Sequence, residues 1–99
     1  MIQQESWYLQ QITLLRTHQR EWNDYAVQAK QARGVLLEQY RFEKAGLYWR
    51  ENALEWAAVL KRHNKAIISL TVANKLKEEA MSRRQKQESL ELGKRFKQE

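Results

Sequence analysis

Two histidines, His18 and His63, are the residues of this 99-residue chain whose chemistry best suits proton transfer or metal binding. Neither belongs to a His-Glu-x-x-His motif or to a similar ligand spacing. Both fall on apolar stripes of the sequence, where a histidine packs between helices. The chain also lacks cysteine, which excludes thiol chemistry and cysteine-based metal sites. We therefore predict no metal site and no cofactor.

Carboxylates are the second class of residue that could do chemistry, and the chain has twelve of them. Most lie three or four residues from a lysine or arginine, as in Arg20/Asp24 and Lys75/Glu79, which is the spacing of exposed ion pairs on a helix. The sequence contains no glycine-rich phosphate loop, no Gly-x-Ser-x-Gly turn and no grouping of serine, histidine and aspartate. These observations predict a protein that is not an enzyme and has no small-molecule substrate.

Basic residues have the clearest functional meaning, because a net charge of +6 and a pI of about 9.8 favour anionic partners. In a hairpin folded about Ala45, Lys30 and Arg33 would lie level with the basic cluster at 61–65. Such a band would supply the closely spaced positive donors that phosphate oxygens need. The predicted contacts to nucleic acid are Lys30, Arg33, Lys61, Arg62, Lys65, Arg83, Arg84 and Lys86. The alternative is that these residues only solubilise a long helical surface.

Helices must position these residues, because apolar residues recur at helical spacing in both halves of the chain and proline is absent. In the second half the spacing alternates between four and three, through Trp49, Ala53, Trp56, Leu60, His63, Ile67, Leu70 and Asn74. In the first half the interval is a strict seven, through Tyr8, Leu15, Trp22, Ala29 and Leu36, with Ile12, His18, Tyr25, Ala26, Ala32 and Tyr40 on the flanks. Each stripe has to pack against another helix, so we predict an all-α fold.

The glycines indicate where the predicted helices begin and end. Gly46 follows basic residues that suit a helix C-terminus, whereas the stripe of sevens continues through Gly34. The sequence thus predicts a coiled-coil-like antiparallel hairpin, with helices at about 6–44 and 47–90 and a turn at 45–46. Residues 1–92 would form a single helical domain, and residues 93–99 a basic polar tail.

Other arrangements remain open at this point. No helix-capping residue follows Gly46 before Asn52, which allows one continuous helix. Breaks at both Gly34 and Gly46 would give three helices. In the hairpin folded about Ala45, Trp56 would lie opposite Gly34, whose missing side chain leaves room for the indole. Gly34 could equally well end a helix.

The chain carries more apolar surface than two helices can cover, including four tryptophans and four tyrosines. We therefore expect a homodimer or a hetero-complex, most simply a second copy that completes a four-helix bundle. The residues predicted at the partner interface are Trp49, Trp56, Leu60, Ile67, Leu70 and Leu76.

No apolar run approaches the roughly 18 residues that cross a bilayer. The first residues also lack the basic and apolar regions of a secretory signal. We therefore expect a soluble cytoplasmic protein that does not act at a membrane.

The sequence predicts a non-catalytic helical subunit of a nucleoprotein complex. It would bind the backbone of DNA or RNA through its basic band, and protein neighbours through its apolar helix faces. The alternative is a protein-only adaptor, chaperone or inhibitor with an acidic protein partner. The two hypotheses differ in whether the basic cluster at 61–65 converges with Lys30 and Arg33 on one face that is free of acidic residues.

Overall fold

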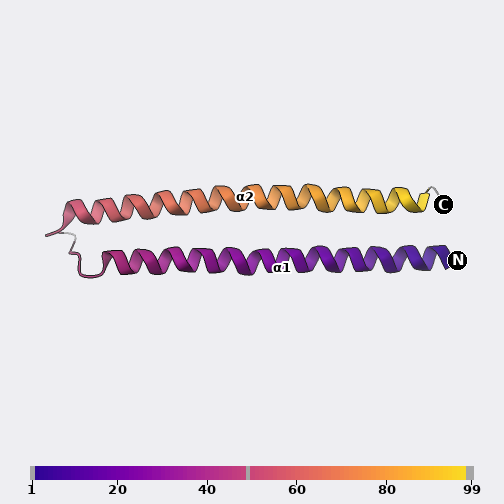
Figure 1. Ribbon diagram of the computed structural model, residues 1–99, viewed down its shortest axis with the longest axis horizontal. Helices are drawn as coiled ribbons and strands as arrows, with labels where there is room; N and C mark the ends of the chain where they lie inside the picture. The colour runs from indigo at the N-terminus through magenta and orange to yellow at the C-terminus, as the bar shows by residue number, and fades with distance from the viewer. Residues whose placement is uncertain (1, 49, 98–99) are drawn as a thin grey trace. The chain divides into compact units, whose positions relative to one another are not determined.

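The chain forms two long α-helices (Figure 1). The computed structural model describes residues 2–48 and 50–97, with side chains from Ser6 onward. Helix α1 spans Ile2–Lys44 and α2 spans Ala53–Lys97. The described residues contain no β-strand. The all-α fold and the helical hairpin are therefore confirmed.

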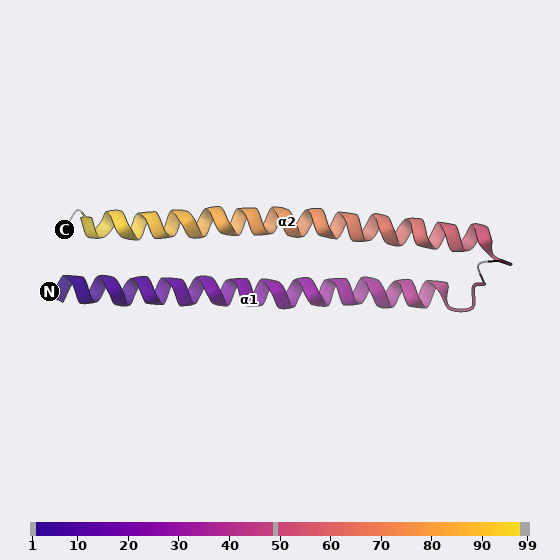
Figure 2. The ribbon, with the colours of Figure 1, turned by 180° about the vertical axis from the view of Figure 1, so that it is seen from behind.

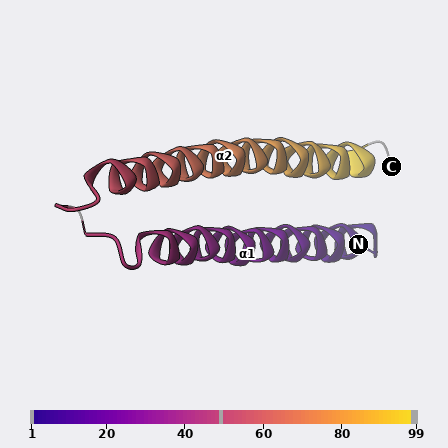
Figure 3. The same cartoon turned by 60° about the vertical axis from the view of Figure 1, so that its left-hand side comes forward.

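The chain divides into two compact units, and each helix contributes to both. We call the residues up to Ala26, with those from Lys77 onward, the terminal unit. The residues Val27–Leu76 are the loop unit. In the terminal unit, the first turns of α1 run beside the last turns of α2 in the opposite direction (Figure 2). In the loop unit, the end of α1 and the beginning of α2 are joined by the segment 45–52 (Figure 3).

Gly46 makes the turn after α1, as the sequence predicts. Its φ of 81° is a left-handed conformation that glycine adopts without steric cost. The Leu47 N–H donates to the Lys44 carbonyl over 3.1 Å, which satisfies one of the free carbonyls at the end of α1. The turn does not lead directly into a helix, however, because α2 begins at Ala53 and not near residue 47.

Asn52 marks the start of α2. Its carbonyl accepts the first hydrogen bond of the helix, from the Trp56 N–H at 2.8 Å. Its side-chain Oδ1 accepts a bond from the Tyr48 N–H at 3.3 Å, which ties the connecting segment to the helix start. Asparagine is among the residues preferred at this position, and Glu55 adds a favourable negative charge in the first turn. The first capping residue after Gly46 is thus where the helix begins.

The other two glycines lie inside helices. Helix α1 continues through Gly34, so the described residues form neither the three-helix arrangement nor one continuous helix. Helix α2 runs through Gly93 to Lys97, past the end expected near residue 90. A Cβ atom at Gly34 would meet nothing within 4 Å, so the predicted packing of Trp56 against this glycine is wrong.

The register of the hairpin differs from a fold about Ala45. In the terminal unit, Trp22 bonds to Gln85, whereas the expected register placed it opposite Ile68. In the loop unit, Tyr40 stacks on His63. The reason lies in the connection: eight residues, 45–52, separate the helices, and α2 begins later than expected.

The two helices bury few side chains between them in either unit, and we call this buried stripe of contacts the seam. His18 and Gln85 are the buried residues of the terminal unit, and Ala29 and Val59 those of the loop unit. No described side chain is fully buried. Two helices shield only one narrow stripe of each other, and neither unit holds a core of the kind found in a globular domain.

The predicted stripes match this seam in the middle of the chain and drift from it elsewhere. Trp22, Ala29 and Leu36 face the partner helix, but Tyr8 and Leu15 are 54% and 56% exposed. An α-helix has 3.6 residues per turn, so a strict seven-residue stripe rotates by about 20° per heptad away from a straight partner. In α2, Val59 is buried and its neighbour Leu60 is 40% exposed, which places the seam beside the predicted stripe.

Candidate protein-interaction surface

Charge is distributed unequally between the two units. The loop unit has nine lysines and arginines against four acidic residues, a balance of +5. The terminal unit has nine against eight, a balance of +1. The excess positive charge of the protein therefore belongs to the loop unit.

One segment of α2 carries much of that excess. Residues 56–77 contain no aspartate or glutamate, and their basic residues are Lys61, Arg62, Lys65 and Lys75 of the loop unit and Lys77, the first α2 residue of the terminal unit. Small and apolar residues fill most of the remaining positions, including the run 66–73. A helix that is apolar on several sides is normally covered on several sides. Here α1 covers only one of them.

Large apolar side chains of the loop unit are accordingly exposed. They come from both helices and from the connecting segment: Val27, Val35, Leu37, Phe42, Tyr48, Leu54, Leu60, Ile68, Val72 and Leu76. Single exposed apolar residues are ordinary on a protein surface, but so many in a 50-residue unit are typical of an interaction surface.

A groove on α2 combines the exposed apolar side chains with the basic ones. We call it the 57–69 groove, and it has a volume of about 560 Å³. Its lining residues are Ala57, Leu60, Lys61, Asn64, Lys65, Ile68 and Ser69. The lining has two large apolar side chains, a small alanine and two lysines one helical turn apart, and it contains no acidic residue. The groove therefore suits a partner that is apolar along one side and negatively charged beside it.

The predicted basic band does not form as one continuous surface. Lys61, Arg62 and Lys65 lie within two turns of α2, where Tyr40 contacts His63. In that register Lys30 and Arg33 lie ten and seven residues before Tyr40 on α1, which is roughly 10 to 15 Å at 1.5 Å per residue. Their predicted position level with the 61–65 cluster is therefore wrong.

Two of the predicted phosphate-binding arginines are engaged with carboxylates. Arg62 pairs with Glu43 at 3.7 Å in the loop unit. In the terminal unit, Arg84 bonds to Glu21 and, at 2.5 Å, to Glu88. The hydrogen bond that the Arg84 guanidinium donates to Glu21 is the main cause that raises the pKa of Arg84 above its ordinary value. Arg83 and Lys86 are exposed beside Arg84, in the unit with little net charge.

The residues predicted at a partner interface divide into two groups. Trp56, Ile67 and Leu70 are half-buried on the side of α2 that faces α1. Leu60 and Leu76 are 40% and 61% exposed. Trp49 lies outside the described residues. A partner could therefore reach Leu60 and Leu76 without separating the helices.

Polar residues hold the seam of the terminal unit. The Trp22 Nε1–H donates to Gln85 Oε1 over 2.9 Å, and Gln85 Nε2 donates to the His18 carbonyl over 3.3 Å. His18 Nε2 lies 3.5 Å from Glu88. Both partners of His18 were missed by the sequence reasoning, although the alternating spacing continues from Asn74 through 77, 81 and 84 to Glu88, with Gln85 one position beside the stripe. Because the stripes were traced through apolar residues, these two polar side chains were not expected between the helices.

In the loop unit, the contacts across the seam are mainly those of aromatic side chains. Tyr40 and His63 stack at 4.2 Å between ring centroids, with an interplanar angle of 25°. Lys44 Nζ lies 4.5 Å from the Tyr40 ring and 5.9 Å from that of Trp56, which are cation–π distances. Both histidines thus pack between the helices, as the sequence predicts.

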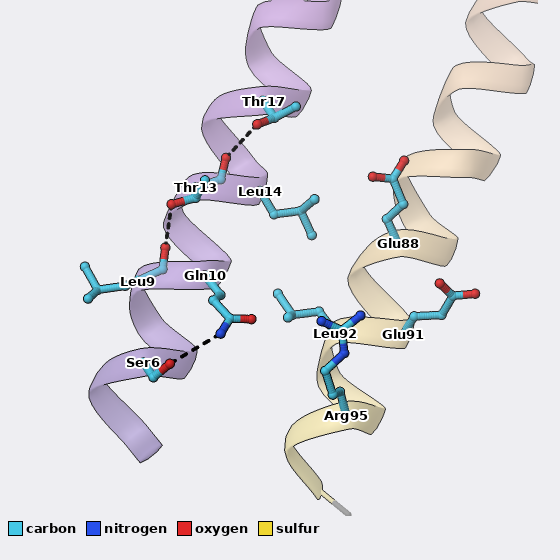
Figure 4. A pocket seen from close by; sticks show the side chains of 10 residues that line it. All are labelled: Ser6, Leu9, Gln10, Thr13, Leu14, Thr17, Glu88, Glu91, Leu92 and Arg95. Atoms are coloured by element: carbon cyan, nitrogen blue, oxygen red, sulfur yellow. Dashed lines mark hydrogen bonds between the residues drawn. The ribbon is translucent and has the colours of Figure 1, made fainter. Parts of the chain in front are cut away.

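The terminal unit has a groove of its own, of about 470 Å³ (Figure 4). Leu14 of α1 and Leu92 of α2 point toward each other across it, with Glu88 and Glu91 on the α2 side (Figure 4). The hydroxyls of Thr13 and Thr17 donate to carbonyls of their own helix over 2.8 and 2.9 Å. The groove thus combines apolar side chains of both helices with the two glutamates of α2.

No group of three or more potential metal ligands occurs among the residues that the structure describes. In the same part of the chain, neither helix has an apolar stretch of the length needed to cross a membrane. Comparisons with protein-family models, with curated proteins and with solved structures found no match to this chain.

Proposed function

We propose that the protein is a non-catalytic helical adaptor, which acts by packing its exposed helix faces against helices of a protein partner. The observation that carries this proposal is that many large apolar side chains of the loop unit are exposed to solvent. Its helices bury only Ala29 and Val59 among the described apolar residues of the unit, while apolar side chains on other sides of both helices stay in water. A hairpin of this kind is half of a helical bundle, and a partner supplies the other half.

The energetics favour association. Full burial of a Val, Leu or Ile side chain is worth about 1.5–3 kcal/mol, and the loop unit leaves many of these side chains exposed. The seam of two helices provides little stabilisation of its own. Binding of a helical partner would therefore both recognise the protein and stabilise it. The partner is another protein or a second copy of this chain.

Two substitutions in the groove test this function. Leu60→Glu with Ile68→Glu should abolish association, because the new carboxylates would be buried in the interface. The helicity of the free chain should change little, since both side chains are already exposed. Association is measured by light scattering of the purified, nuclease-treated chain and by its recovery with partners from its host.

Leu90→Glu is the matched control. This leucine is 51% exposed in the terminal unit, so its substitution should leave association unchanged. A chain that stays a stable monomer without protein partners would refute the adaptor function, as would equal loss of association in both variants.

Binding to nucleic-acid backbone is a second candidate function, favoured by the +5 balance of the loop unit. The measurement is retention of duplex DNA and of single-stranded RNA by the full chain. If phosphates are bound through the loop unit, Lys61→Glu with Lys65→Glu should lower the affinity at least tenfold. Arg83→Glu with Lys86→Glu should have little effect. Affinity weaker than the roughly 10⁻⁴ M of non-specific binders would rule this candidate out.

A further inference from the structure

We propose that the 57–69 groove binds an acidic amphipathic helix of another protein. This proposal rests on the adaptor function and specifies the chemistry of the partner.

The lining of the groove defines one side of the contact. Leu60 and Ile68 supply the apolar contact area, and Ala57 leaves room for close approach of a helix backbone. Helix-in-groove recognition needs apolar anchors at spacings of three, four and seven residues on the bound helix. The groove spans residues 57–69, which is about 20 Å of helix at 1.5 Å per residue. It therefore accommodates three to four turns of a partner.

Charge defines the other side of the contact. Lys61 and Lys65 line the groove, and in the described part of the chain neither forms an ion pair. The cause is the acid-free segment 56–77, which places no carboxylate of α2 within one turn of them. Arg62 and Arg84, by contrast, are already neutralised by glutamates. Two unneutralised ammonium groups beside an apolar surface complement glutamates on the flank of an amphipathic helix.

A second copy of the chain is a poor occupant of this groove. In a symmetric dimer the same patch meets itself, so the two lysines of one copy would lie close to the two lysines of the other. The loop unit carries +5, and two of them in contact would repel each other. A nucleic-acid backbone would satisfy the lysines but would leave Leu60 and Ile68 without apolar contact. An acidic helix satisfies both features.

Paired helical peptides test the proposal with the full chain. Each acidic peptide carries leucines at spacings of three and four with glutamates on the flanks, and each has a twin with lysines in place of the glutamates. Binding is measured by fluorescence anisotropy. We expect the acidic peptides to bind at least tenfold more tightly than their lysine twins. Lys61→Glu with Lys65→Glu should reverse this preference, and Leu60→Ala should weaken binding of both kinds.

The control pair Arg83→Glu and Lys86→Glu changes the net charge equally but lies outside the groove, so it should leave the preference intact. Equal binding of the acidic and lysine peptides would overturn the proposal, as would no binding of either. Displacement of the acidic peptide by duplex DNA at equal concentration would do so too, by assigning the groove to nucleic acid.

The outcomes separate this inference from the adaptor function. If the acidic peptides fail to bind but Leu60→Glu with Ile68→Glu still abolishes association, the occupant is wrong and the adaptor function stands. If neither experiment shows an effect, both are wrong.

Discussion

At the scale of single residues, Gln85 shows how a polar side chain fixes the pairing of two helices. Its amide accepts from the Trp22 indole and donates to the His18 carbonyl, and it is 9% exposed. A polar group at such a position is satisfied in one register and unsatisfied in the others, so it selects that register. The apolar stripes alone leave the register undetermined, which is why a fold about Ala45 looked acceptable from the sequence.

Gln85→Ala should lower the free energy of unfolding by about 1–3 kcal/mol, because it leaves the Trp22 N–H without its partner in a partly buried seam. Urea unfolding followed by circular dichroism measures the change. Gln87→Ala is the control, since Gln87 is exposed and donates to Glu91 on its own helix. Equal destabilisation by the two variants would show that Gln85 has no special role.

At the scale of elements, the sequence determined the helices better than the segment that connects them. The pattern predicts two helices, the end of α1 and the turn at Gly46, because each depends on local spacing and on backbone freedom. The start of α2 depends on Asn52 and on its bond to the Tyr48 N–H, a contact that a stripe of apolar residues does not reveal. The candidate site was predicted in part for the same reason. Lys61 and Lys65, predicted as contacts to nucleic acid, line the 57–69 groove, but the error in register misplaced Lys30 and Arg33.

Gly34 and Gly46 should respond in opposite ways to the same substitution. Gly34→Ala should stabilise the chain by up to about 1 kcal/mol, because the added Cβ meets nothing within 4 Å and alanine favours the helix. Gly46→Ala should destabilise it by about 1–2 kcal/mol, because its φ of 81° is strained for alanine. Thermal unfolding of both variants beside the native chain provides the check. A stabilising Gly46→Ala would show that the turn is not needed in this form.

At the scale of the whole molecule, the two units differ in their balance of charge and in how much of their apolar surface is exposed. The terminal unit balances its charges through pairs such as Arg84 with Glu21 and Glu88. The loop unit holds nine basic residues against four acidic ones, and it leaves many of its large apolar side chains exposed. The sequence predicted an excess of apolar surface, but only the three-dimensional division of the chain located the positive charge.

The two units should respond to added salt in opposite directions. Screening weakens the ion pairs of the terminal unit and relieves the repulsion within the loop unit, since the Debye length falls from about 10 Å at 0.1 M to about 3 Å at 1 M. Amide hydrogen exchange, read separately for each unit, should become faster in the terminal unit and slower in the loop unit as salt rises. Changes of the same sign in both would contradict this account.

The register of the hairpin also has a consequence for the order of folding. Contacts of the terminal unit join residues far apart in sequence, with separations of 70 for His18 and Glu88 and 63 for Trp22 and Gln85, whereas Tyr40 and His63 of the loop unit are much closer. Closure of a short loop costs less entropy than closure of a long one. The loop unit should therefore form first, and the helices of the terminal unit should pair afterwards. In stopped-flow experiments, Val59→Ala should therefore slow folding, whereas Gln85→Ala should mainly speed unfolding. A chain built in this way opens first at its ends, while the loop unit, which carries the proposed interaction surface, forms earliest and is lost last.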